Sequence, residues 1–303
     1  MPLIPTPLQA STIPEIQVDG RANAELARDV SLLQIDEDVN GLRRLLATFV
    51  AIGPREGAPS EQLNWLDGAV LDFGKELRVS MGPSDAREQM FAGKLSAIEL
   101  SMEQGRTPEV VCLAEDTLMD LRMTRRFKTY ENVSEADLLQ QIAGEHGLRA
   151  AADVDGPTWP LAQQWNLSDL AFLRERARRL AAEVWVDGDT LHMATRDQRR
   201  GNSLTLIQGG NLLQLRLRAD LAQQRSKVVV GGFDDNDQDA IDEEAGDSAV
   251  AAEAQGNAHA VQVLDRAFGE RVSYRVREVP LADAEASAMA RAALLGQIGR
   301  AHV

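Results

Sequence analysis

The residues best suited to catalysis or metal binding are few in this sequence, and they are scattered along it. The four histidines, His146, His192, His259 and His302, include no two at a spacing typical of metal ligands. No G-x-S-x-G, Walker A, H-E-x-x-H or G-x-G-x-x-G motif occurs. Acidic residues are plentiful, but their spacing alone assigns none of them a general acid or base role. We therefore nominate no catalytic, cofactor-binding or metal-binding residue.

The individual reactive side chains have structural roles that account for them. His146 falls at the end of an expected helix, where a cation interacts favourably with the helix dipole. His192 falls on an expected hairpin strand, where we expect packing. Cys112 lies in an apolar run and is expected to be a buried small hydrophobic residue. A single cysteine also excludes a disulfide framework or a cysteine-based zinc site within one chain.

An acidic run between Asp234 and Asp247 raises the question of calcium. Asp235, Asp237 and Asp239 match early ligand positions of an EF-hand loop. However, Ala240 stands where that loop needs glycine, and Gly246 stands where it needs a bidentate glutamate. Calcium binding by residues 234–247 therefore stays open. No lysine or arginine occurs from Val228 to Asp265, so residues 231–257 are expected to form a solvated or disordered loop.

A second charged cluster, Arg174–Arg179, belongs to an expected helix. Leu170, Leu173 and Ala177 are expected to face inward, and the charged residues are expected to face water. Such a basic face is either simply solvated or a contact for an acidic partner. The sequence leaves both readings open.

The composition indicates a soluble globular protein with two or three domains. The chain has 303 residues, 44% of them hydrophobic and 26% charged, which is enough to bury a sizeable core. The net charge of -15 and the aromatic content of 4% argue against nucleic-acid binding. No stretch resembles a signal peptide, and no apolar run approaches the ~20 residues that cross a membrane. We therefore expect no membrane insertion by this chain, and expect folding and assembly in the cytoplasm.

The elements expected before residue 124 are short strands separated by turn residues. This pattern predicts a small antiparallel barrel or a curled sheet. Trp65–Phe73 is expected to be a short helix or irregular, and Gly93 is expected to kink a long strand. The expected strands are Glu15–Gly20, Val30–Ile35, Leu42–Ile52, Glu76–Met81, Gln89–Glu103 and Glu109–Glu115.

Residues 125–193 read as strand, helix, strand, helix and hairpin. A strand covers Arg125–Tyr130, and Ser134 with Asp137 caps the first helix. Gly147 ends that helix, and an extended segment resumes at Leu148. A second helix begins within Gln164–Leu170, with Asn166 or Ser168 as its cap. Asp187–Gly188 then marks a hairpin.

The remainder is expected to be another β-rich region with a terminal helix. A helix is expected over Ala282–Gln297, which is rich in alanine. The last six residues, Ile298–Val303, match one translated reading frame of a common sequencing adapter, so we exclude them from fold reasoning. We also expect the natural C-terminus to lie beyond this sequence. The expected strands are Leu204–Ile207, Leu212–Arg218, Lys227–Val230, Val261–Leu264 and Val272–Val276.

Several of these stretches resemble one protein family. The capped helix N-V-S-E-A-D-L-L at Asn132–Leu139, the segment Q-W-N-L-S-D-L at Gln164–Leu170 and the hairpin V-W-V-D-G-D-T-L at Val184–Leu191 resemble late-control D proteins of contractile phages. They also resemble the hub part of VgrG spike proteins of type VI secretion and the hubs of extracellular contractile injection systems. Two strands, Phe91–Glu99 and Cys112–Leu118, fit the same family.

The resemblance implies an α+β, mostly β fold with two barrel-like antiparallel β domains and an intervening α/β module. The domains would cover residues 1–123, 124–198 and 199–297, the last being an incomplete second barrel. The family's function implies a structural baseplate hub subunit, a homotrimer that joins the tail tube protein to the spike protein among other baseplate proteins. The alternatives are a tail-associated cell-wall-degrading enzyme and a monomeric β-rich binding or adhesin protein. The sequence does not distinguish a phage from an injection particle or a type VI system.

Overall fold

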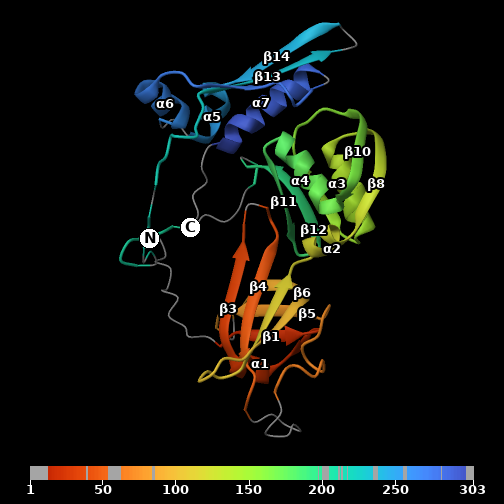
Figure 1. Cartoon of the computed structure of the whole chain (residues 1–303), viewed down its shortest axis with the longest axis vertical. Helices are drawn as coiled ribbons and strands as arrows, with labels where there is room; N and C mark the ends of the chain where they lie inside the picture. The colour runs from red at the N-terminus through yellow and green to blue at the C-terminus, as the bar shows by residue number, and fades with distance from the viewer. Residues whose placement is uncertain are drawn as a thin grey trace. The chain divides into compact units, whose positions relative to one another are not determined.

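The computed structural model describes residues 13–38, 40–53, 63–83, 86–196, 198–199, 205–210, 212, 214–216, 218–234, 238–254, 258–280 and 282–297. The class is α+β and mostly β, which confirms the class expected from the sequence (Figure 1). The chain divides into two compact units, one ending at Thr124 and the other beginning at Arg125. A further division near residue 198 stays a prediction. Among the residues described, no helix is long and apolar enough to cross a membrane.

The first unit is built on one antiparallel sheet of seven strands. The strand order is β2–β1–β5–β6–β7–β4–β3, so the sheet is open, with β2 and β3 at its edges. Neither short helix of this unit, α1 or α2, was predicted from the sequence. The elements are β1 (Glu15–Val18), β2 (Arg21–Ala22), α1 (Ala24–Asp29), β3 (Val30–Glu37), β4 (Arg43–Val50), β5 (Glu76–Met81), β6 (Glu88–Ser101), β7 (Glu109–Glu115) and α2 (Leu118–Met123).

Strand β6 passes from one half of this sheet to the other. Its first half pairs with β5 and its second half with β7, and Lys94 lies opposite both Glu76 and Glu115. At the crossing point, a Cβ atom on Gly93 would collide with the carbonyl oxygen of Glu115. Only glycine fits such a close approach of two backbones. The close approach therefore explains the glycine at this position, and the expected kink at Gly93 stays a prediction.

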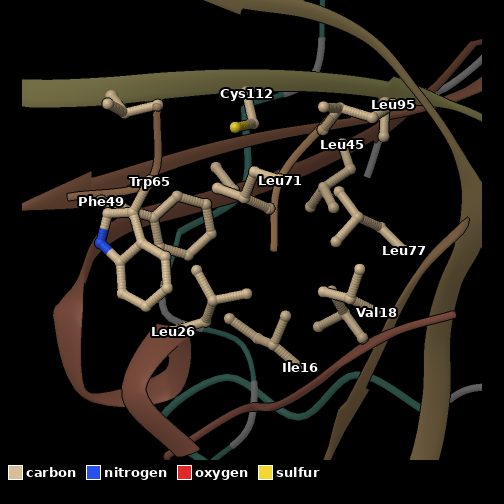
Figure 2. Packing of buried hydrophobic residues seen from close by; sticks show 14 of the residues in the cluster. Ile16, Val18, Leu26, Leu45, Phe49, Trp65, Leu71, Leu77, Leu95 and Cys112 are labelled. Atoms are coloured by element: carbon tan, nitrogen blue, oxygen red, sulfur yellow. The ribbon is translucent and has the colours of Figure 1, made fainter. Parts of the chain in front are cut away.

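The core of the first unit is an apolar cluster enclosed by this sheet. Figure 2 shows the side chains of Phe49, Trp65 and Leu77 directed into one space. Trp65 comes from the segment before β5, which is irregular, and its indole Nε1 donates to the carbonyl of Val50 at 3.2 Å. Cys112 is buried in the same cluster, as predicted, and burial raises the pKa of its thiol to about 12. The thiol is therefore not a reactive group.

The second unit begins with two small sheets and two helices. Strands β10 and β8 form an antiparallel ribbon, and β12 lies between β11 and β9 in a three-stranded sheet. The elements are β8 (Arg125–Val133), α3 (Glu135–Glu145), β9 (Arg149–Asp153), β10 (Trp159–Ser168), α4 (Asp169–Arg179), β11 (Ala182–Asp187) and β12 (Thr190–Thr195). We call this set the α/β module. Strand β10 was not predicted, and the expected helix start at Gln164 lies inside it.

Local capping explains where the two module helices begin and end. The Ser134 hydroxyl accepts from the backbone N–H of Asp137, whose carboxylate accepts from the Ser134 N–H, which completes the expected capping box. Gly147 has a φ of 68°, as expected for a left-handed stop. For α4 the structure selects Ser168 as the cap, whereas Asn166 forms an irregularity in the β10–β8 ladder.

The rest of the second unit is a three-stranded sheet covered on one face by a helix. Its strand order is β14–β13–β15, and Val228, Val230 and Ile241 pack against α7 (Figure 1). The helix expected near the end of the chain is therefore confirmed. The elements are β13 (Lys227–Asp234), β14 (Asp239–Ala245), α5 (Asp247–Ala254), α6 (Ala260–Phe268), β15 (Val272–Arg275) and α7 (Asp283–Gln297).

Three predictions for this part of the chain were wrong. The acidic stretch 231–257 is not a loop where it is described, because β14 buries Ile241 and Ala245 and exposes Asp242 and Glu244 between them. The strand expected at 261–264 is part of α6, whose apolar residues recur at helical spacing. The described residues of 204–218 form only an isolated bridge between Gln208 and Leu212, with no regular strand. Residues 298–303 lie outside the described part.

Candidate functional site

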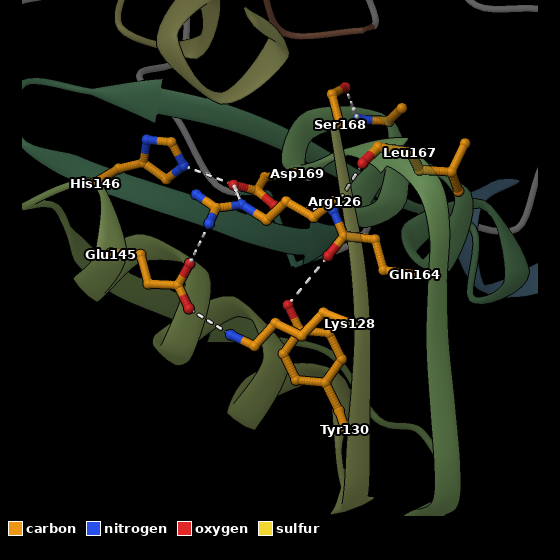
Figure 3. A network of polar contacts seen from close by, with 10 residues as sticks. Arg126, Lys128, Tyr130, Glu145, His146, Gln164, Leu167, Ser168 and Asp169 are labelled. Atoms are coloured by element: carbon orange, nitrogen blue, oxygen red, sulfur yellow. Dashed lines mark hydrogen bonds and ion pairs between the residues drawn. The ribbon is translucent and has the colours of Figure 1, made fainter. Parts of the chain in front are cut away.

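The densest cluster of titratable groups in the α/β module surrounds Asp169. This residue opens α4, and only 1% of its side chain is exposed. Its carboxylate accepts hydrogen bonds from Arg126 Nε at 2.9 Å and from Gln164 Nε2 at 2.9 Å, and lies 2.8 Å from His146 Nε2 (Figure 3). The three partners come from β8, the end of α3 and β10. One buried carboxylate thus joins four elements of the module.

A second carboxylate extends this network toward the surface. Glu145 contacts Lys128 Nζ and lies 3.4 Å from a guanidinium nitrogen of Arg126. The Tyr130 hydroxyl donates to Gln164 Oε1 at 3.2 Å, and the Tyr130 ring stacks on Phe172 at 5.7 Å between centroids. The ribbon is therefore tied to both helices by polar and aromatic contacts.

The charge state of Asp169 follows from these contacts. Burial alone would raise the pKa of its carboxyl, but hydrogen bonds from Gln164, His146 and Arg126 outweigh burial and lower that pKa. The carboxylate is therefore ionised at neutral pH. It also lies at the N-terminus of α4, where a negative charge interacts favourably with the helix dipole.

The His146–Asp169 pair has the partners of a general-base pair but not the surroundings of one. A hydrolytic triad also needs a hydroxyl or thiol on the second ring nitrogen of the histidine. No such hydrogen bond to His146 occurs within the described part of the chain. The hydroxyl of the neighbouring Ser168 caps α4 by accepting from the N–H of Ala171 at 3.2 Å. The arrangement therefore holds α3, α4 and the ribbon together. His146 takes part in this through its contact with Asp169, and it also lies at the end of α3, as expected.

A buried ion pair lies on the other side of α3 and α4. Arg176 is 6% exposed and Glu135 is 1% exposed, and Arg176 Nε lies 3.0 Å from Glu135 Oε1. The guanidinium also lies 4.1 Å from the centre of the Trp159 ring, a cation–π contact. The expectation that Arg176 faces water was wrong. Its helical spacing from Leu173 and Leu180 places it on the inward face, and this was the signal available in the sequence.

His192 is packed in the hairpin, as predicted. Its ring stacks on Trp185 at 4.9 Å, and the guanidinium of Arg199 lies 4.4 Å from the same indole. Burial lowers the pKa of His192. This half-buried stack is a packing feature of β11 and β12.

The proposed calcium ligands are not brought together by the described residues. Asp235 and Asp237 lie outside the described part, and Asp239 begins β14. Across the described ranges, no group of three or more histidine, cysteine, aspartate or glutamate residues is placed to hold a metal ion. An EF-hand loop is also incompatible with the extended backbone of β14.

The surface features that remain are sheet edges and faces without a partner. Strand β3 pairs with β4 on one side, and no strand of the described chain pairs with its other side. On the outer face of the ribbon, Phe127 and Trp165 lie directly opposite each other and are 80% and 67% exposed. Open edges can pair with another chain, and exposed aromatic side chains are common at contact surfaces. Sequence patterns alone did not identify the ribbon face, because β10 was not recognised as a strand.

Comparisons with known proteins identify the fold. A family model described as the Alg8 N-terminal domain matches residues 11–298. The 43 kDa tail protein of prophage MuSo2 from Shewanella oneidensis has a similar structure, with a TM-score of 0.60 and 15% identity over 91% of this chain and 76% of that chain. The tail protein from Neisseria meningitidis MC58 has a TM-score of 0.59 and 11% identity over 92% of this chain and 75% of that one.

A third solved structure matches less well. The structure of the Francisella PdpA–VgrG complex matches with a TM-score of 0.47 and 12% identity, over 88% of this chain and 40% of that one. No curated protein matches the sequence. The likeness to the two tail proteins agrees with the resemblance seen in the sequence and with the α+β, mostly β class. Among the described residues the sheets are open, so the barrel-like domains that the resemblance implied are not closed barrels.

Proposed function

We propose that this chain, which belongs to the family described as the Alg8 N-terminal domain, is a structural hub subunit of a contractile phage tail or a phage-like injection system, because it folds like solved phage tail proteins. The observation that carries the proposal is the likeness to the Shewanella oneidensis prophage tail protein over 91% of this chain. Three copies form a ring that joins the tail tube to the spike, together with other baseplate proteins. The subunits assemble in the bacterial cytoplasm and become part of the particle.

The open edges of the sheets support a role in assembly. An unpaired strand edge offers free backbone donors and acceptors, and proteins usually cover it or blunt it. Strand β3 leaves eight residues of edge, Val30–Glu37, open to a neighbour. In a closed ring each copy covers the open edge of the next one. The work of the subunit is therefore mechanical and depends on large interfaces between copies.

The buried polar groups of the α/β module support the same proposal over an enzymatic one. Asp169, His146 and Arg126 are engaged with one another, and Arg176 is engaged with Glu135. These contacts hold elements of the module in place, and among the described residues no hydroxyl or thiol nucleophile is hydrogen-bonded to His146. We propose that the chain has no catalytic activity of its own.

Size-exclusion chromatography with light scattering tests the assembly. We expect a mass three times the 33.1 kDa of one chain at micromolar concentration. A mass of one chain at every concentration would contradict the hub and would favour a monomeric β-rich binding protein. Co-purification with the tail tube protein encoded in the same gene cluster tests the partner.

An assay of peptidoglycan degradation tests the alternative of a cell-wall-degrading tail enzyme. We expect no release of soluble fragments above a buffer blank. Release that persists after repurification would favour the enzyme, and the loss of that release in His146→Ala would locate it in the α/β module.

A further inference from the structure

The outward face of the β14–β13–β15 sheet carries two of the acids of this region, whereas Glu243, opposite Val230, lies on the same face as the buried Ile241. Val228 and Val230 of β13 and Ile241 of β14 are buried toward α7. Because side chains alternate along a strand, the residues between them point the opposite way. On β14 these are Asp242 and Glu244, and Asp242 is exposed. We call Phe233, Asp242, Glu244 and Tyr274 the acidic face.

Two aromatic residues accompany these acids. Phe233 is 51% exposed, and Tyr274 is 71% exposed on the neighbouring strand β15. Lys227 Nζ lies 2.9 Å from Glu244, and the next basic residue along the chain is Arg266. The face is therefore a mixed acidic and aromatic surface with little positive charge of its own.

The opposite charge gathers where α4 meets α7. Two clefts of about 510 and 410 Å³ share Arg178 in their walls. Across the described residues, Arg178, Arg277 and Arg291 form no ion pair, and all three are exposed. We call Arg178, Arg196, Arg275, Arg277 and Arg291 the arginine patch.

The acids near this patch balance only part of its charge. Asp153 and Asp155 line the larger cleft, and Glu175 and Glu278 line the smaller one. Arg275 lies 2.5 Å from Glu278, so this arginine is already paired. The patch is nevertheless a basic surface on a chain whose net charge is -15, where most other surfaces repel an acidic partner.

The acidic face and the arginine patch lie on opposite sides of α7. One side of α7 packs on β13 and β14 (Figure 1). Its other side contacts α4, where Arg179 donates to Glu285 at 3.3 Å. The acidic face points away from α7, whereas the arginine patch opens between α7 and α4. The two surfaces therefore cannot meet within one chain.

We propose that the acidic face of one copy docks on the arginine patch of the next copy. This inference rests on the proposed function and names the two surfaces that join its subunits. Complementary surfaces on opposite sides of a subunit produce head-to-tail contacts, which close into a ring when the rotation allows. Guanidinium groups suit this contact because they pair with carboxylates and also stack on aromatic rings.

Charge reversal on each surface of the full chain tests the contact. The patch variant carries Arg178→Glu and Arg291→Glu, and the face variant carries Asp242→Lys and Glu244→Lys. Light scattering is measured over a dilution series at low and high salt. We expect each variant to weaken assembly at least tenfold at low salt, because like charges then face each other at every contact. Circular dichroism and thermal melting check that each variant is folded.

Combining the patch substitutions and the face substitutions tests the contact more directly than either variant alone. A chain with all four changes regains complementary surfaces, so we expect its assembly to recover. In an equal mixture each variant docks only on the other one, so the chains must alternate, and because a ring of three cannot alternate we expect assemblies with an even number of chains in place of the trimer. A control with Arg106→Glu and Arg218→Glu, two exposed arginines outside the patch, should assemble like the wild-type chain.

Three outcomes would overturn the inference. If both variants assemble like the wild type, the contact lies elsewhere and the hub proposal stands. If the patch variant keeps its trimer but loses the tail tube protein, the arginine patch serves that partner. If the wild-type chain itself is monomeric, the hub proposal fails and the inference fails with it.

Discussion

The core of the first unit is mainly apolar, whereas the α/β module combines apolar side chains with a larger share of buried charged ones. The first unit surrounds an apolar core in which Phe49, Trp65 and Phe91 are almost completely buried. The module instead places charged groups inside, with Glu135 paired to Arg176 and Asp169 bonded to three partners. Both regions are compact, but their cohesion has different physical origins.

This difference in buried side chains affects how precisely the geometry of each region is fixed. Apolar burial is favourable in any orientation, so it stabilises the sheet without fixing the direction of each side chain. Paired charges are directional: Asp169 fixes the start of α4 against β8 and β10, and Glu135 fixes the start of α3 against α4. A buried ion pair adds little net stability, but the removal of one partner leaves an uncompensated charge. The module should therefore be more sensitive to loss of a charge than to loss of a methyl group.

The largest effect that we predict comes from breaking the buried ion pair. Arg176→Ala leaves Glu135 buried without a partner and should lower the free energy of unfolding of the module by about 3–5 kcal/mol. Urea unfolding followed by fluorine NMR of fluorotryptophan at Trp159 and Trp185 reports this region. Arg149→Ala, which breaks an exposed pair with Asp189, is the matched control and should change the free energy of unfolding little.

The double variant Glu135→Leu with Arg176→Met sharpens this prediction. It replaces the pair with apolar groups of similar size, so its unfolding free energy should return close to that of the wild type. If the double variant is as unstable as Arg176→Ala, the pair is needed for more than charge compensation.

Truncation in the apolar core should cost slightly less. Leu77 is 1% exposed in β5, and Leu77→Ala should destabilise the first unit by about 3 kcal/mol through lost burial and a cavity. The fluorine signal of Trp65 measures unfolding of this unit. The control Leu66→Ala removes a side chain that is 40% exposed and should change the free energy little. Equal effects at both positions would contradict an apolar core as the main source of stability.

One buried carboxyl in the first unit should make its stability depend on pH. Burial raises the pKa of Asp116 to about 6, although its carboxylate accepts from the N–H groups of Arg43 and Leu118. Because this pKa lies above the unfolded value, the stabilisation is complete below about pH 4 and is lost as the pH rises through 6. A rise in the pKa of Asp116 from about 4 to about 6 corresponds to a change in the free energy of unfolding of at most about 3 kcal/mol.

Urea titrations at pH 4.5 and pH 7.5, read at Trp65, check this dependence. In Asp116→Asn the difference between the two pH values should largely disappear. A wild-type first unit that is more stable at the higher pH would refute the assignment.

The α/β module should show a smaller dependence of the opposite sign. The pKa of Asp169 is lowered, so its contribution is complete above the unfolded value of about 4 and is lost as the pH falls through the folded pKa. Asp169→Asn should destabilise the module at pH 7 by about 1–3 kcal/mol and flatten its response below pH 4. Urea unfolding between pH 2.5 and pH 7, followed by the fluorine signal of fluorotryptophan at Trp159, measures both effects. Wild-type and variant curves that stay parallel throughout would exclude Asp169 as the titrating group.

Short-range signals predicted the local geometry well. The Ser134–Asp137 capping box, the stop at Gly147 and the hairpin at Asp187–Gly188 each depend on contacts within a few residues. The buried position of Cys112 also followed from its apolar neighbours. The sequence predicts these features because the groups that contact or hydrogen-bond each other are only a few residues apart in the chain.

Long-range contacts decided the rest. Strand β10 forms because Trp165 pairs with Phe127 across the ribbon, although its last residues look locally like a helix start. The acidic stretch that contains Asp242 forms a strand because its side chains alternate between the buried face of the sheet and the solvent. In the polar cluster, His146 marked a helix end in the sequence, but only the fold brought it to Asp169.

The sequence by itself therefore determined the mostly β class, the caps and the turns. Only the tertiary structure decided which charges are buried together, where the first sheet stays open and which faces are left for partners. The physical reason is distance along the chain: Glu135 and Arg176 are 41 residues apart, and nothing local to either indicates the other. Such pairs form when packing brings them together and excludes the water that would otherwise solvate them.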